Sequence, residues 1–127
     1  MSATENRRPR ANGEKAAAVS NFVIKTVSEY TGRGPTKART YIEDDLVTVV
    51  LRDSLTKGER SLVRDGRPEL VLSTRLAFQQ TMKDDLRAGV EEIMGRKVEA
   101  FLSANHMEPD IAIESFILVR DEEGDDA

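Results

Sequence analysis

Residues 30–45, with the sequence YTGRGPTKARTYIEDD, contain the side chains whose types and spacing could best bind an anion. Glycines let backbone N–H groups approach an anion, and Arg33, Lys37 and Arg39 would add positive charge. The run GRGPTK lacks the Walker A spacing and is expected to join a helix to a strand, so we do not predict a nucleotide P-loop. Arg39 and Tyr41 alternate onto one face of an extended strand, and Arg33 and Lys37 could converge beside them. We therefore predict an anion-binding or partner-binding surface of these four residues; the alternative is that the glycines and the proline only cap a helix and turn the chain.

The other residues that could do chemistry give weaker patterns. Glu43, Asp44 and Asp45 are adjacent carboxylates that would point apart in a turn, and no EF-hand pattern surrounds them, so a solvated turn is expected. His106 is the single histidine of the chain, and one imidazole among turn acids is a poor zinc ligand set. Ser103 lies near it in sequence without any sign of an activated nucleophile. We expect no metal site, no cofactor and no enzyme activity.

Composition narrows the class of protein. The chain has 127 residues and no cysteine, which excludes thiol catalysis and cysteine-based zinc sites and fits a reducing cytoplasm. No apolar run approaches the roughly 20 residues that a membrane-spanning helix needs, so we expect a cytoplasmic protein without membrane insertion. Residues 1–42 carry eight Lys and Arg against three acids, whereas residues 43–127 carry eleven against twenty. The basic first third keeps nucleic-acid binding open, although the chain shows neither paired sheet aromatics nor a clear recognition helix.

The surface predicted above would be positioned by a helix and a hairpin. Residues 1–13 are polar and are expected to be a disordered tail. Apolar residues then recur at three- and four-residue spacing over about 14–31, which predicts a helix that ends at Gly32. The segments ARTYI and LVTVVLRD, separated by the acids at 43–45, predict a hairpin whose second, nearly continuous apolar strand lies inside the sheet.

Two further helices are expected. Residues 56–59, TKGE, match a capping box, which predicts a short helix over about 57–65. Pro68 either begins a new helix or kinks a single long one. The long helix, about 68–94, would be on the order of 40 Å long at 1.5 Å per residue, so we expect a second chain to cover part of it. Its expected apolar stripe comprises Leu72, Leu76, Met82, Leu86, Val90 and Ile93.

A second hairpin completes the domain. The segments KVEAFLS and AIESFILVR flank NHMEPD, whose Asn, Pro and Asp are typical of a turn, and residues 121–127 form an acidic tail. Gly32-Arg33 and Gly95-Arg96 hold the same place in two α-β-β halves, which indicates a possible internal duplication. We predict an α+β fold of α-β-β-α-β-β order over residues 14–120, with two layers and helices on one face of a mainly antiparallel four-stranded sheet.

Several stretches resemble a known family. GRGPTKAR, VVLRD, MGRKV and FLSANHMEPD are similar to the MpsC-type family, named for a sodium-translocating, membrane-potential-generating system, and the resemblance extends over about residues 14–119. It implies a link to such a system but no catalytic residues. Without a membrane-spanning segment the chain could not itself move sodium, so the resemblance implies an accessory or regulatory subunit.

Three functions are therefore expected, in decreasing order. The first is a non-enzymatic, homo-oligomeric module, with a dimer favoured, that docks on a membrane transport or bioenergetic protein through Arg33, Lys37, Arg39 and Tyr41. The second is a domain that senses a small anion or nucleotide through the same loop. The third is weak nucleic-acid binding, whose affinity would fall steeply with salt.

Overall fold

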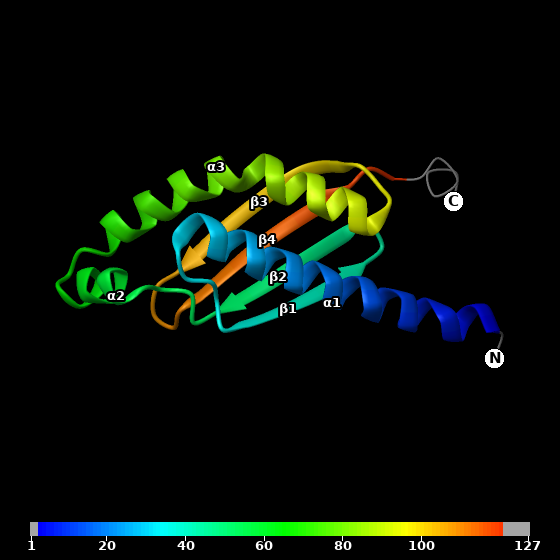
Figure 1. Ribbon diagram of the computed structural model, residues 1–127, viewed down its shortest axis with the longest axis horizontal. Helices are drawn as coiled ribbons and strands as arrows, with labels where there is room; N and C mark the ends of the chain where they lie inside the picture. The colour runs from blue at the N-terminus through cyan, green and yellow to red at the C-terminus, as the bar shows by residue number, and fades with distance from the viewer. Residues whose placement is uncertain (1–2, 121–127) are drawn as a thin grey trace.

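The computed structural model describes the backbone of residues 3–120 and the side chains of residues 12–120. Over these residues the elements are α1 (Ala3–Thr31), β1 (Lys37–Glu43), β2 (Leu46–Arg52), α2 (Lys57–Arg64), α3 (Pro68–Met94), β3 (Val98–His106) and β4 (Ile111–Leu118). The sheet has the order β1-β2-β4-β3, and each pair of neighbouring strands is antiparallel (Figure 1). The predicted α+β class is confirmed, and β2 is an inner strand as expected.

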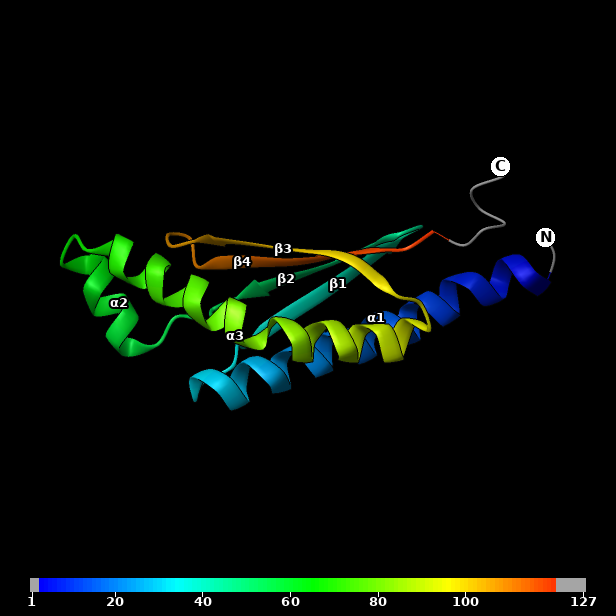
Figure 2. The ribbon, with the colours of Figure 1, turned by 90° about the horizontal axis from the view of Figure 1, so that it is seen from above.

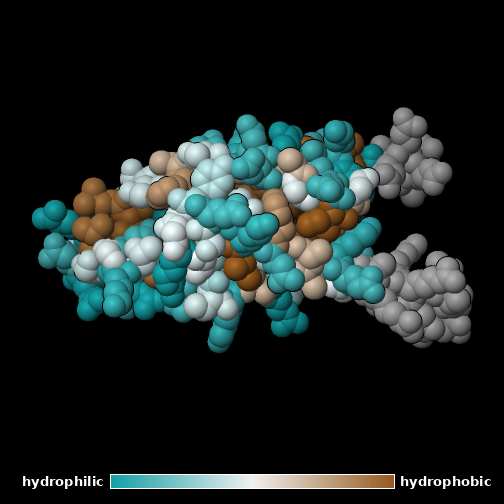
Figure 3. Space-filling view, viewed as in Figure 1, coloured by the Kyte–Doolittle hydropathy of each residue, from teal (hydrophilic) through white to brown (hydrophobic). Residues whose placement is uncertain are grey.

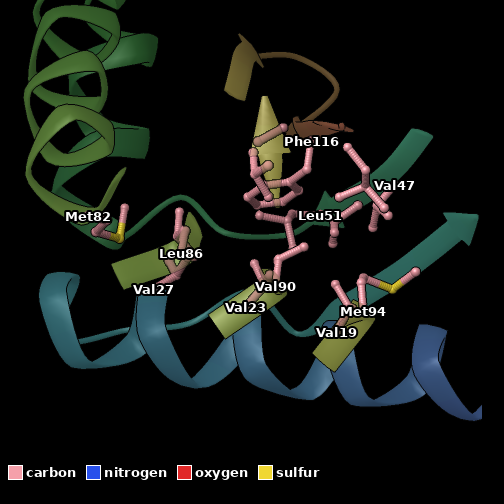
Figure 4. Close-up of a cluster of buried hydrophobic side chains, with 14 residues drawn as sticks. Val19, Val23, Val27, Val47, Leu51, Met82, Leu86, Val90, Met94 and Phe116 are labelled. Carbon is pink, nitrogen blue, oxygen red and sulfur yellow. The ribbon is translucent and has the colours of Figure 1, made fainter. Parts of the chain in front are cut away.

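The molecule has two layers. Helices α1 and α3 lie on one face of the sheet, and the edge-on view shows them together below the strands (Figure 2). Val47, Val49 and Leu51 alternate along β2 toward the helices and are almost completely buried. They meet Val23 of α1 and Leu86 of α3 in the core (Figure 4). Burial of each such side chain stabilises the fold by about 1.5–3 kcal/mol, so this layer contact holds the domain together.

Helix α1 begins earlier than predicted. It starts at Ala3, so the disordered tail expected over residues 1–13 is helical from residue 3, and residues 1–2 lie outside the described part of the chain. Among the side chains described, none of residues 12–18 is buried and the first buried one is Val19. Extending a helix that is already anchored needs no new nucleation, and Ala, Glu and Arg favour it. The acidic tail at 121–127 also lies outside the described residues.

Helices α2 and α3 are separate. The Thr56 hydroxyl accepts a hydrogen bond from Glu59 N at 3.1 Å, and Thr56 N donates to Glu59 Oε1 at 2.8 Å, which confirms the capping box. Pro68 occupies the first position of α3, where its missing N–H costs nothing, so it begins a new helix.

The buried face of α3 differs in part from the predicted stripe. Leu76 is 53% exposed, whereas Val71 and Gln79 are buried together with Met82, Leu86, Val90 and Met94. The helix is rotated so that a polar side chain, Gln79, faces inward. The helix-covered side is mostly hydrophilic, and its hydrophobic residues gather near α2 and in patches in the middle of this side (Figure 3). Leu70, near the start of α3, is 45% exposed.

The two halves use the same joint. Gly32 and Gly95 both adopt the left-handed conformation, with φ of 80° and 69°, and each is followed by an arginine. Arg33 donates to the carbonyl of Asp53, just after β2, and Arg96 donates to the carbonyl of Val119, just after β4. The second strands of both hairpins pair at the centre of the sheet. Each half therefore fixes its hairpin to its helix in the same way, and α2 is inserted between the halves.

Candidate functional site

Three of the four predicted surface residues lie together. Lys37, Arg39 and Tyr41 alternate with inward-facing residues along β1 and are exposed on the face of the sheet that points away from the helices. The guanidinium carbon of Arg39 lies 5.2 Å from the centre of the Tyr41 ring, a cation–π distance. The strand therefore brings these three side chains to one face, as its alternation predicted.

Arg33 is engaged elsewhere. Its Nη1 donates to the carbonyls of Asp53 at 2.8 Å and Leu55 at 3.1 Å, and its Nη2 lies 3.4 Å from the Asp53 carboxylate. Thr36 donates to the same carboxylate at 2.9 Å, and Arg60 pairs with it. The Thr36 hydrogen bond, followed by the charges of Arg33 and Arg60, lowers the pKa of Asp53 despite an opposing desolvation effect. Arg33 thus ties the loop to the segment after β2 and does not converge with the other three residues.

The acidic turn is partly paired. Asp44 adopts a left-handed φ of 49° in the tight turn, and Glu43 lies on the exposed face of β1. Asp45, however, accepts hydrogen bonds from Arg96 at 2.7 Å and Arg120 at 3.1 Å. The Arg96 hydrogen bond is the main cause of the lowered pKa of Asp45. This turn therefore anchors the joints of the second half, in addition to reversing the chain.

The structure also shows a pocket that was not predicted from the sequence. A cavity of about 260 Å³ lies among the C-terminal end of α1, the first half of α3, strands β2 and β4, and the segment between β2 and α2. Its apolar wall is formed by Val27, Leu51, Phe78, Met82 and Ala112. Its polar side chains are Thr31, Ser54, Thr56, Glu59, Thr74, Arg75, Gln79 and Glu114. An apolar cavity with a few converging polar groups is the usual form of a small-molecule site.

Arg75 and Glu59 balance each other's charge in this pocket. Arg75 Nη2 donates to Glu59 Oε1 at 2.9 Å and its Nε donates to Glu59 Oε2 at 3.1 Å, a bidentate pair. Arg75 also donates to the hydroxyl and the carbonyl of Ser54, at 3.0 and 2.9 Å. Burial raises the pKa of Glu59, but the hydrogen bonds from Arg75 and from the Thr56 backbone outweigh burial, so its pKa is lowered. Glu59 is therefore a carboxylate at neutral pH.

Glu114 differs from Glu59 because its hydrogen-bond donors are neutral. It is 3% exposed; Gln79 Nε2 donates to its Oε1 at 3.1 Å, and the Ser103 hydroxyl donates to its Oε2. Burial raises the pKa of Glu114 to about 7, and these hydrogen bonds together with the charge of Arg75 offset that effect only in part. Gln79 is itself fixed by reciprocal hydrogen bonds with Asn105, at 3.1 and 3.2 Å. The pocket thus holds an oriented carboxyl group that changes its protonation near neutral pH.

A signal for this site was present in the sequence. Glu114 lies between Ala112 and Phe116, on the inward side of an otherwise apolar strand face. Gln79 occupies an inward position of α3 between Val71 and Met82. Buried polar groups cost free energy unless they are hydrogen-bonded, so two of them on facing elements indicate a polar cluster. Their pairing required the tertiary structure.

The single histidine belongs to a turn. His106 ends β3, and its Nδ1 lies 2.8 Å from the carbonyl oxygen of Pro109, so it supports the connection to β4. In residues 12–120, no three acidic or histidine side chains converge in a way that could hold a metal ion.

The fold and the pocket define a two-layer α+β protein with a small, partly polar cavity between its helices and its sheet. Residues 11–120 match the MpsC family, described as Na⁺-translocating membrane potential-generating system, and the chain belongs to this family. The family name associates the chain with a sodium-translocating, membrane-potential-generating system.

A curated relative is similar to the chain over nearly the whole of both proteins. It is the Bacillus subtilis (strain 168) protein named Uncharacterized protein YrhF, which is 26% identical over 110 residues, covering 84% of this chain and 89% of the relative. No solved structure matches the chain. Among the described residues, no helix combines the length and the apolar character needed to cross a membrane.

Proposed function

We propose that this chain is a non-enzymatic, cytoplasmic accessory subunit of a sodium-translocating, membrane-potential-generating system, and that it is regulated by a small organic cation bound in the pocket. The family membership supports the link to the system. The observation that carries the regulatory role is the oriented, buried carboxyl of Glu114 in an apolar cavity.

The cavity sets the size and the apolar character of the ligand. Its volume of about 260 Å³ lies just below the roughly 300–1,000 Å³ of sites for drug-sized ligands. Leu51, Phe78 and Met82 would contact an alkyl or aryl group. A ligand with a single ring or a short alkyl chain and one polar end fits these dimensions.

The charges set the polar end of the ligand. The charge of Arg75 is balanced by Glu59, so ionisation of Glu114 adds a net negative charge to the pocket. An ammonium group within hydrogen-bond distance of the Glu114 carboxylate would favour its ionised form. The attraction between the two charges would offset the free-energy cost of burying that carboxylate. A ligand carboxylate would instead be repelled by Glu59 and Glu114. We therefore assign the ligand to the class of primary amines with an apolar substituent.

The test compares benzylamine, benzyl alcohol and benzoate, which share a ring and differ in charge, by isothermal titration calorimetry at pH 8. Benzylamine should bind at least about tenfold more tightly than the other two, since a partly buried ion pair is worth more than about 1.4 kcal/mol. Its affinity should rise about tenfold between pH 6 and pH 8, because ionised Glu114 increases about tenfold across a pKa near 7. Glu114→Gln should remove both the preference for the amine and the pH dependence.

Glu99→Gln is the matched control, because Glu99 is an exposed carboxylate on β3 outside the pocket. This variant should bind benzylamine like the unchanged chain. Equal affinity for the amine and the alcohol, absence of binding at millimolar concentration, or unchanged amine binding by Glu114→Gln would each contradict the ligand assignment.

Anion sensing and nucleic-acid binding stay predictions from the sequence. Both functions would use the cations of residues 33–39. Arg33 already donates hydrogen bonds to the carbonyls of Asp53 and Leu55, so one of these cations is engaged within the chain.

A further inference from the structure

The face of the sheet opposite the helices, called the open face below, is not covered by any element of the described chain (Figure 2). The inward-facing residues on the strands alternate with a second set that points to this face. The open face comprises Lys37, Arg39, Tyr41 and Glu43 on β1; Leu46, Thr48, Val50 and Arg52 on β2; Ile111, Ile113, Ser115 and Ile117 on β4; and Ala100, Leu102, Ala104 and His106 on β3.

The open face carries several exposed apolar side chains. Leu46 and Ile113 are each 38% exposed, and Leu102 is 56% exposed. The polar side chains at the centre, Thr48 and Ser115, bond each other at 3.1 Å across β2 and β4. This hydrogen bond satisfies one of the two O–H donors, which lowers the cost of removing water from the pair. Exposed apolar side chains gathered on one face of a domain are typical of an interface.

The charges of the open face are separated along β1. Lys37 begins the strand and Glu43 ends it, about 20 Å apart for six steps of 3.3 Å. Arg39 lies next to the basic end, and Arg52 faces Lys37 from β2. The open face therefore has a basic end and an acidic position at the opposite end of the same edge strand.

We propose that the open face binds the open face of a second copy of the chain, about a two-fold axis that lies between the two sheets and runs perpendicular to the strands. Such an axis reverses the strand direction while it keeps β1 over β1. Lys37 then lies over Glu43 of the partner subunit, and the symmetry makes this contact twice. An axis parallel to the strands would place β1 over β3, where Ala100, Leu102, Ala104 and His106 offer Lys37 no acid.

The area of the open face is close to what such a dimer needs. Four strands about 4.8 Å apart and seven residues long span about 450 Å² as a flat surface. Two faces together cover about 900 Å² before the relief of the side chains is counted, close to the roughly 1,000–1,200 Å² at which specific interfaces begin. The sheets would pack aligned, as in a β-sandwich.

A second copy of the chain would occupy the partner surface that the sequence predicts. Lys37, Arg39 and Tyr41 were expected to contact a partner, and the partner inferred here is a second copy. The pocket lies on the helix side of the sheet, so the dimer and the ligand proposal can fail independently.

Charge reversal tests the axis. Sedimentation equilibrium should show a dimer for the unchanged chain, and Lys37→Glu or Glu43→Lys should each weaken it about tenfold to a hundredfold, since two contacts become repulsive. Combining both substitutions should restore the dimer to within about threefold of the original affinity, because each pair is again opposite in charge. Lys57→Glu, which reverses an exposed lysine on α2, is the matched control and should leave dimerisation unchanged.

Ile113→Asp tests the apolar part of the open face. This side chain points to the open face and not to the core, so the variant should keep its circular dichroism spectrum and become monomeric. A monomeric unchanged chain at about 100 µM, where a micromolar dimer would be formed, overturns the proposal. A dimer that survives Ile113→Asp, or that is not restored by the double charge reversal, also overturns it. In either case an intact response to benzylamine would leave the proposed function standing.

Discussion

At the scale of single residues, Glu114 makes stability depend on pH in the direction opposite to most carboxylates. Its pKa is about 7 in the folded chain against an ordinary value of 4.5, so between these values the folded state holds a proton that the unfolded state has lost. The free energy of unfolding therefore falls as pH rises through this window. The lowered pKa values of Asp45, Asp53 and Glu59 act with the opposite sign, and their stabilisation is lost as the pH falls into the acid range.

The effect of Glu114→Gln follows from the difference between the pKa of Glu114 in the folded and in the unfolded chain. The amide is neutral at every pH, so the variant should lose the decline between pH 5 and pH 8 that Glu114 causes. At pH 8 the variant should be more stable than the unchanged chain by up to about 3 kcal/mol, which follows from a pKa of about 7 in the folded chain against the ordinary 4.5. Urea unfolding at both pH values measures the difference. A parallel decline in the variant would show that Glu114 is not the cause.

At the scale of elements, the contact between α1 and α3 depends on a glycine. A Cβ at Gly89 would overlap the ring of Phe22, which packs against the core from α1. Glycine inside a helix normally costs about 1 kcal/mol relative to alanine, so its presence in α3 needs a compensating reason. The reason is the approach of an aromatic ring to the backbone of α3, which lets both helices reach the same face of the sheet.

Gly89→Ala should therefore destabilise the protein by about 1–3 kcal/mol, because forced repacking against Phe22 outweighs the gain in helix propensity. Gly58→Ala in α2 is the matched control, since the nearest atom to its added Cβ is Thr56 Oγ1 at 3.9 Å. This control should be neutral or stabilising by up to about 1 kcal/mol. Denaturant midpoints measure both effects, and Phe22→Leu should rescue Gly89→Ala. Stabilisation by Gly89→Ala would show that the ring moves aside freely.

At the scale of the whole molecule, the proposed ligand site and the proposed dimer surface lie on opposite sides of the sheet. The helix side holds the pocket with Arg75 and Glu114, and the opposite side is the open face. β4 belongs to both, because Glu114 points to the pocket and its neighbours Ile113 and Ser115 point to the open face. A ligand in the pocket and a second copy on the open face would thus contact the same strand.

The proposed accessory role predicts a measurable loss in the cell. Removal of this chain should lower the sodium-dependent part of the membrane potential, recorded with a voltage-sensitive dye with and without sodium outside. Supplying the unchanged chain should restore it, and Glu114→Gln should restore it without regulation by the cationic ligand. An unchanged potential after removal, with the other components of the system still produced, would contradict the accessory role.

The sequence by itself determined the order of the elements and their local ends. Apolar periodicity predicted the long helix, the capping box at Thr56 and Glu59 predicted the start of α2, and Pro68 left two alternatives that the structure resolved. Capping hydrogen bonds and the periodic burial along one element depend on residues that are close in sequence, so both can be predicted without knowing the fold. The first turns of α1 could not, because their sequence shows no apolar periodicity.

Only the tertiary structure decided which polar residues meet. Lys37, Arg39 and Tyr41 share a face because strand alternation requires it, but Arg33 binds Asp53 and Leu55, 20 and 22 residues away. Gln79, Ser103 and Glu114 come from α3, β3 and β4, and their contact depends on the packing of the helices on the sheet. Contacts between residues distant in sequence depend on how the helices pack on the sheet. No single segment of the chain determines that packing, because it depends on all the elements together.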